Sequence, residues 1–151
     1  MSDSCDPALM LPHWDGQTHK LPIRVYYEDT DAGGIVYHSC YVNFAERGRT
    51  EFLRAVGFNQ SRLVEEVGVL FAVRSMEIDF KKPARLDDLV VLETRCEKFK
   101  GASFIMDQKI YLKDELLIDI KVRIACVSTD LRPCKIPEAI KIAMTDFAAN
   151  E

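Results

Sequence analysis

The strongest constraint on the fold is a run of alternating side chains in the second half of the chain. Apolar residues recur at nearly every second position in four consecutive segments: 70–80, 89–99, 102–112 and 116–126. Period-two alternation is typical of strands that bury only one face. The pattern therefore predicts four long strands, each with one apolar face.

Short turns at residues 100–101 and 113–114 join the last three of these strands, which favours antiparallel hairpins. A longer connection, KKPARLDD, follows the first of the four. LPIRVYYE, residues 21–28, also alternates and predicts an earlier strand. Residues 1–20 lack periodicity, so we expect an irregular leader in which His13 and His19 are solvated loop residues.

One long helix is predicted at residues 39–56, between the early strand and the later four. Its apolar stripe consists of Tyr41, Phe44, Ala45, Gly48, Phe52, Ala55 and Val56. Gly48 in mid-helix costs up to ~1 kcal/mol relative to alanine, which a close approach to a sheet or a partner would explain. Shorter helices are expected at residues 60–67 and 137–149.

A curved antiparallel sheet wrapped around this helix would bury both apolar faces. The expected fold class is therefore α+β, with a single domain over residues 21–151. Such a sheet leaves long edges, which proteins usually cover or pair, so a dimer is expected. No apolar run approaches the ~18 residues that a membrane-spanning helix requires.

The charge and cysteine content exclude several functional classes. The net charge is −4, and this acidic balance argues against a nucleic-acid partner, because phosphate contacts need basic residues. The five cysteines are odd in number and contain no C-x-x-C pair, so reduced thiols in a cytosol are expected rather than a zinc or disulfide framework. Cys96 and Cys126 fall on apolar strand faces and are predicted to be core residues.

Glu28, Asp29 and Asp31 form a tight acidic cluster just before Gly33–Gly34 and the helix start. The cluster could bind a metal through carboxylate oxygens, or supply an aspartyl nucleophile for phosphoryl transfer, which the hairpin pattern disfavours. A carboxylate could instead attack a carbonyl whose oxygen is held by helix N-terminal amides. An acidic loop that merely caps the helix is also compatible with these residues.

His38 lies at the expected helix start, seven residues after Asp31. Its side chain could polarise a substrate or protonate a leaving group, and a structural role is equally open. Cys40 cannot easily pair with His38, because side chains two positions apart point to different faces of a helix. A Cys–His nucleophile is therefore not expected.

The run YYEDTDAGGIVYHSCYVNFAERGRTEFLRAVGF closely resembles the signature of hotdog-fold acyl-CoA thioesterases of the Tol–Pal-associated branch, relatives of 4-hydroxybenzoyl-CoA thioesterase. The similarity extends from about residue 21 to residue 137. The resemblance implies a hotdog fold, an antiparallel sheet around one long helix. It also implies cytoplasmic hydrolysis of acyl-CoA thioesters without metal or cofactor, coenzyme A being part of the substrate. Sites between two subunits, in homodimers or homotetramers built as dimers of dimers, are expected as well.

The family's catalytic aspartate corresponds to Asp31, as nucleophile or general base. The resemblance places the oxyanion site at backbone amides of the helix start, with His38 as main donor and Tyr37 and Gly34 beside it. The His38 side chain matches the Tol–Pal-associated branch, whereas the 4-hydroxybenzoyl enzymes that resemble it carry tyrosine there. Glu28 and Asp29 are then expected to shape the loop.

Coenzyme A in this fold is bound by strands and hairpins after the helix, often from a neighbouring subunit. The candidate contacts are Lys98, Lys100, Gly101, Ala102 and Ser103 at the first tight hairpin, followed by Arg85, Lys81 and Lys82. An alternative from another class is a scaffold that binds acyl carrier protein in envelope or lipid metabolism and hydrolyses weakly. A hotdog dehydratase would need a catalytic His–acid pair, and the sequence around His38 does not resemble one.

Overall fold

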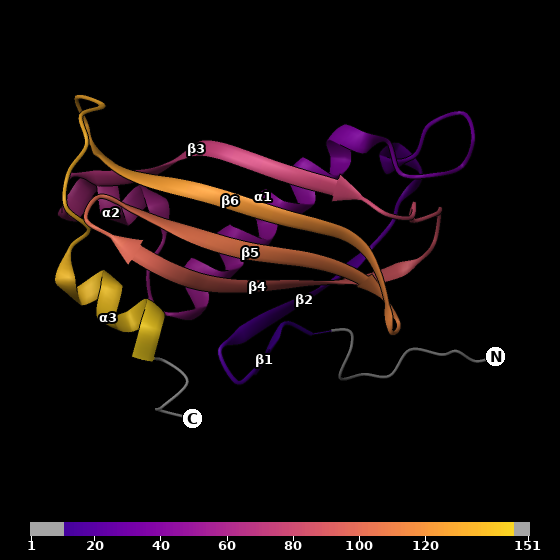
Figure 1. Ribbon diagram of the computed structural model, residues 1–151, viewed down its shortest axis with the longest axis horizontal. Coiled ribbons are helices and arrows are strands. Elements are labelled where there is room, and N and C mark those ends of the chain that lie inside the picture. The colour runs from indigo at the N-terminus through magenta and orange to yellow at the C-terminus, as the bar shows by residue number, and fades with distance from the viewer. Residues whose placement is uncertain (1–10, 147–151) are drawn as a thin grey trace.

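The computed structural model describes residues 11–146, which form one antiparallel sheet with helices packed against it (Figure 1). The elements in chain order are β1 (His13–Asp15), β2 (Thr18–Arg24), a 3-10 turn (Tyr27–Asp29), α1 (His38–Ala55), α2 (Gln60–Glu66), β3 (Val69–Phe80), β4 (Leu89–Lys100), β5 (Ser103–Leu112), β6 (Glu115–Ser128) and α3 (Glu138–Asp146). The six strands are ordered β1-β2-β4-β5-β6-β3. The predicted α+β fold, a sheet around one long helix, is confirmed.

Helix α1 lies behind the sheet and crosses its strands obliquely (Figure 1). Its apolar stripe packs on the inward side chains of the central strands, and the members of this core with no exposed surface include Phe44, Phe52, Leu92, Ile110 and Ile120. Burial of apolar surface stabilises a fold by about 25 cal/mol per Å². The helix is therefore held mainly by the alternating residues from which the strands were predicted.

Strand β3 does not pair with β4, the next strand in the chain. It crosses to the far edge of the sheet and pairs with β6, with Met76 opposite Val122. Its other edge has no partner strand within residues 11–146. Val73 and Phe80 on this strand are 47% and 49% exposed, so the long edge also carries apolar surface.

At Gly48, α1 approaches the sheet closely, as its mid-helix position suggested. A Cβ at this position would lie 2.3 Å from Leu92 Cδ2 and 3.0 Å from both Gln108 Nε2 and Thr94 Oγ1. Gln108 is fully buried, and its Nε2 donates hydrogen bonds to the Ala45 carbonyl (2.9 Å) and to Thr94 Oγ1 (3.0 Å). A polar network thus joins the helix to β4 and β5 through the gap that Gly48 leaves.

The prediction of an irregular leader is wrong for residues 13–20, which form β1 and the start of β2; residues 1–10 lie outside the described part. His19 is buried rather than solvated, because the turn at Gly16 (φ 61°) folds β1 and β2 over α1. The ring of His19 lies 4.9 Å from that of Trp14 and 6.4 Å from that of Phe52. His13 is half-buried in β1.

Other differences from the predicted elements are small. Strand β2 begins three residues earlier than expected and ends at Arg24, since the backbone then turns into the 3-10 segment. Residues 147–149 of the predicted terminal helix lie outside the described residues. Cys126 is buried as predicted, whereas Cys96 is half-buried.

Candidate active site

Asp31, Tyr37 and His38 line one cleft of about 340 Å³. The cleft lies at the end of the sheet where α1 begins and β3 ends. The remaining walls come from Ile35, Val36, Tyr41, Phe80, Lys81, Lys82, Pro83 and Ile118. The structure therefore brings together the predicted reactive acid and the predicted helix start.

The loop that carries the acids is closed by hydrogen bonds to Asp29. The buried Asp29 side chain accepts a hydrogen bond from the Tyr26 N–H (2.9 Å), and its carbonyl accepts one from the Tyr37 N–H (2.9 Å). Thr30 and Val36 also form an isolated antiparallel bridge. Asp29 thus shapes the loop, as expected, while Glu28 is exposed.

Asp31 is exposed, and its carboxylate is held from one side. Its Oδ1 accepts a hydrogen bond from the Gly33 N–H (2.8 Å), and its own N–H donates to the Ile35 carbonyl (2.9 Å). A Cβ at Gly33 would lie 3.3 Å from Oδ1, so glycine leaves room for this contact. No residue between 11 and 146 donates a hydrogen bond to Oδ2, which is free to face a ligand.

Two of the three amides predicted to form the oxyanion site are already used within the loop. The Tyr37 N–H donates to the Asp29 carbonyl, and the Gly34 N–H donates to the Asp31 carbonyl (3.1 Å). The Gly34 amide is engaged because Gly34, at φ 79°, closes a tight turn back to Asp31. The His38 N–H has no acceptor in the described part of the chain, as is usual for the first residue of a helix, and it lies at the positive end of the helix dipole.

The His38 side chain is exposed and lies against Tyr37. The two ring centroids are 4.4 Å apart, with an interplanar angle of 40°. Both side chains line the cleft with Asp31. An imidazole in this position can donate or accept a proton at the mouth of the cleft.

Tyr41 fixes the opposite wall of the cleft. Its buried hydroxyl accepts a hydrogen bond from the Ala84 N–H (3.0 Å), and burial raises the pKa of this phenol. The contact holds residues 81–88 against the start of α1. Arg85 forms an isolated bridge with Ile35, which places this candidate coenzyme A contact beside the Asp31 loop.

Lys81 and Lys82, which were also considered as coenzyme A contacts, line the Asp31 cleft. The candidates at the β4–β5 turn, in contrast, are not brought to Asp31 within one chain. Lys98, Lys100 and Gly101 are exposed at the β4–β5 turn, at the opposite end of the sheet (Figure 1). The ten residues of β5 separate the two ends by about 30 Å, at ~3.3 Å per residue. Only a second chain could bring this turn to an Asp31 cleft.

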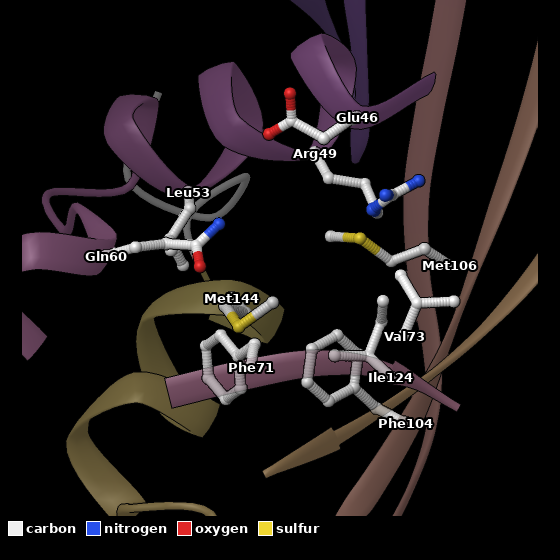
Figure 2. A pocket seen from close by; sticks show the side chains of 10 residues that line it. All are labelled: Glu46, Arg49, Leu53, Gln60, Phe71, Val73, Phe104, Met106, Ile124 and Met144. Atoms are coloured by element: carbon white, nitrogen blue, oxygen red, sulfur yellow. The ribbon is translucent and has the colours of Figure 1, made fainter. Parts of the chain in front are cut away.

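A second cavity, of about 270 Å³, lies between α1, the sheet and α3 (Figure 2). Most of its walls are apolar, and its polar members are Glu46, Arg49 and Gln60. The sequence reasoning did not single out Arg49. Its position four residues after Ala45 and three before Phe52, both on the apolar stripe, is the signal that could have found it.

Within residues 11–146, no three His, Cys, Asp or Glu side chains are grouped so that they could hold a metal ion. In the cluster considered for metal binding, Asp29 and Asp31 instead accept hydrogen bonds from backbone amides. The helices of the described part include none long and apolar enough to cross a membrane.

Residues 33–118 match the Thioesterase superfamily. This match spans more than half of the chain, so the chain belongs to that superfamily, as its resemblance predicted. It is 44% identical to the acyl-CoA thioester hydrolase YbgC of Escherichia coli, over 80% of this chain and 91% of the relative. It is 43% identical to the acyl-CoA thioesterase YbgC of Haemophilus influenzae, over 82% and 91%. These relatives confirm the predicted class of enzyme, a thioesterase.

Solved structures agree with the fold. A probable thioesterase from Bartonella henselae has a TM-score of 0.77 and 42% identity, over 80% of this chain and 99% of that chain. The 4-hydroxybenzoyl-CoA thioesterase of Pseudomonas has a TM-score of 0.79 at 18% identity, over 83% and 98%. At that low identity the similarity concerns the hotdog fold alone, which it confirms for this chain.

Proposed function

We propose that this chain hydrolyses acyl-CoA thioesters, with Asp31 as nucleophile or general base and the His38 amide as oxyanion donor. The observation that carries the proposal is the shared cleft, into which the Asp31 carboxylate and the start of α1 both open. The relatives named acyl-CoA thioesterases support the choice of substrate.

The reaction begins with attack on the thioester carbonyl carbon. In one route, Asp31 attacks directly, the C–S bond breaks and coenzyme A leaves as a thiolate. Water then hydrolyses the resulting mixed anhydride to the free acid and restores the carboxylate. In the other route, Asp31 takes a proton from a water molecule that attacks the carbonyl. Either way, negative charge develops on the carbonyl oxygen, where the His38 N–H and the helix dipole stabilise it.

Our proposal includes a dimer in which two chains pair along β3. A homotetramer is then a pair of such dimers. A two-fold axis across the edge places the first half of β3 beside the second half of the partner's β3, because the strands run antiparallel. Phe80, at the end of β3, lines the Asp31 cleft. The cleft of one chain therefore lies next to the partner's Phe71 and Val73, and the partner also supplies coenzyme A contacts.

Replacing Asp31 with asparagine tests the assignment. Loss of the carboxylate should lower kcat by ~10²-fold or more, the scale of a lost general base. The matched control is Glu28→Gln, which removes an exposed acid from the same loop and should leave turnover unchanged. Near-normal turnover by the Asp31→Asn variant on its best substrate would refute the role of Asp31.

A single turnover in heavy-oxygen water separates the two routes. Direct attack transfers the label to the Asp31 carboxylate, since water cleaves the anhydride at that carbonyl. General-base catalysis places the label in the released acid alone. Mass spectrometry of the peptide that contains Asp31 shows whether its carboxylate carries the label.

A panel of acyl-CoAs and acyl carrier proteins distinguishes the enzyme from the scaffold alternative. A relative at 25% identity, from Arabidopsis thaliana, is named an acyl-acyl carrier protein thioesterase, which is why the carrier-bound substrates are included. We expect at least one acyl-CoA to exceed a kcat/KM of ~10⁴ M⁻¹s⁻¹, the low end for ordinary enzymes. Slower hydrolysis of every substrate, with tight binding of the carrier protein, would favour the scaffold.

A further inference from the structure

Arg49 places a positive charge in the wall of an otherwise largely apolar cavity. Its side chain reaches from α1 toward Met106, above a floor that includes Phe71 and Phe104 (Figure 2). Burial lowers the pKa of this guanidinium, and the attraction of Glu46 only partly opposes the effect. Arginine nevertheless remains charged in proteins, so the cavity holds a cation that is incompletely solvated.

The guanidinium is fixed by a network rather than by an ion pair. Its Nη1 donates a hydrogen bond to Gln108 Oε1 (3.1 Å). The amide group of Gln108 is held in turn by the Ala45 carbonyl and Thr94 Oγ1. A guanidinium has five N–H donors, and the described residues occupy one of them. The others are left in a fixed orientation at the cavity.

No carboxylate among residues 11–146 forms an ion pair with Arg49. Glu46 lies one turn earlier on α1 and also lines the cavity, but its Oε2 accepts a hydrogen bond from Thr50 Oγ1 (2.7 Å). A half-buried charge without a paired anion is costly. Arginine forms its strongest contacts with carboxylates, through two parallel hydrogen bonds.

We propose that Arg49 selects acyl groups that carry a carboxylate at the end distant from the thioester. The inference rests on the proposed function, because the thioester must lie at an Asp31 cleft for the acyl group to enter the cavity. The apolar walls contact the methylene chain, and the guanidinium binds the terminal carboxylate. The volume of about 270 Å³ is close to the lower limit of ligand pockets, as suits a short acyl chain.

The dimer along β3 supplies the path from thioester to cavity. Phe71 and Val73 line the cavity and belong to β3, whose outer edge has no partner strand within residues 11–146. In the proposed pairing they lie beside the partner's cleft. An acyl group attached at the Asp31 cleft of one chain thus extends into the cavity of the other.

The test compares acyl-CoAs of equal carbon number with and without a terminal carboxylate: glutaryl with valeryl, adipoyl with hexanoyl, and suberoyl with octanoyl. The protein should favour the carboxylated member of at least one pair in kcat/KM. Arg49→Met should lower that preference by about 10- to 100-fold, the range for hydrogen bonds to a charged group. Arg47→Met, on the same helix, is the matched control and should leave the ratio unchanged.

Binding to an inactive protein separates this inference from the proposed function. In the Asp31→Asn background, the Kd of the carboxylated acyl-CoA should rise when Arg49 is replaced, whereas that of its uncharged partner should not. Such binding without any turnover in the parent protein would refute the proposed function and leave the inference standing. Turnover with a preference for uncharged chains in every pair, unaffected by Arg49→Met, would refute the inference alone.

Arg49→Lys covers the case in which the methionine variant does not fold. It keeps the charge but loses the planar pair of donors, so the preference should fall without reversing. If Arg49→Lys leaves both the substrate ratio and the Kd unchanged, carboxylate recognition by the guanidinium fork is refuted. Loss of dimer stability with an unchanged ratio would assign Arg49 to the subunit contact and also overturn the proposal.

Discussion

His19 is a titratable base enclosed by aromatic rings. Its side chain is 2% exposed, and its Nδ1 has no hydrogen-bond partner within the described residues. Burial lowers the pKa of this imidazole more than the charge of Glu51 raises it, and His13 lowers it further. The folded protein therefore favours the neutral ring.

This environment predicts that acid destabilises the fold through His19. Between the lowered pKa of His19 in the folded protein and its ordinary value of about 6.5, the unfolded state binds more protons than the folded state. The contribution of His19 to the free energy of unfolding therefore rises with pH across that window and is constant above it. His19→Phe should reduce the fall in Tm on going from pH 7 to pH 5. His38→Gln, which removes an exposed histidine, is the control and should leave the fall in Tm unchanged. Parallel Tm curves for His19→Phe and the parent protein would contradict the prediction.

Gly48 controls how closely α1 packs on the sheet. Alanine would improve helix propensity by up to ~1 kcal/mol, but its Cβ would overlap Leu92, which has no exposed surface and little room to move. We expect Gly48→Ala to lower the free energy of unfolding by about 1–3 kcal/mol, the usual range for an overpacked core. Denaturant unfolding measures the change.

Shortening Leu92 provides the control for this substitution. Combining Gly48→Ala with Leu92→Val removes the reach of the overlapping methyl group, so the double variant should lose less than the sum of the single changes. If Gly48→Ala is as stable as the parent protein, the Leu92 side chain can move away from the added methyl group and the packing of α1 on β4 is not limiting.

The long elements were predictable because their alternation and helical stripe extend over many residues. The β1–β2 hairpin was missed although glycine at the first position of a two-residue turn, here Gly16–Gln17, is a known hairpin signal. Its strands are short and gain their burial from Trp14 and His19 against α1. The order of the strands, with β3 paired to β6, depends on contacts between distant segments that no local pattern specifies.

The candidate site was only partly predictable for a related reason. The position of Asp31 followed from a local signature. The hydrogen bonds that the Tyr37 and Gly34 amides donate within the loop could not be predicted, because they depend on how the loop folds back on itself. Arg49 stood out only when α1 and the sheet placed it beside an apolar cavity.

At the level of the assembled molecule, β3 supplies the edge along which we expect two chains to pair. Ser75 lies near the middle of this strand and is exposed. A two-fold axis brings such a residue close to its own copy, so Ser75→Lys would set two like charges against each other. Light scattering should show a dimer or larger assembly for the parent protein and a shift toward monomer for Ser75→Lys.

The same substitution should lower thioesterase activity per chain, since the proposed sites need both subunits. Ser61→Lys, on the exposed face of α2, controls for the added charge. A parent protein that is monomeric and fully active at the assay concentration would contradict the shared site.

The Asp31 cleft and the Arg49 cavity share no lining residue. In the proposed dimer, each active site combines Asp31 of one chain with the Arg49 cavity of the other chain. A chain that has lost Asp31 therefore still determines which acyl groups its partner accepts. After a gene duplication, one copy could retain the chemistry while the other diverged in selectivity, and a mixed dimer would acquire a new substrate without a change at the reacting carboxylate.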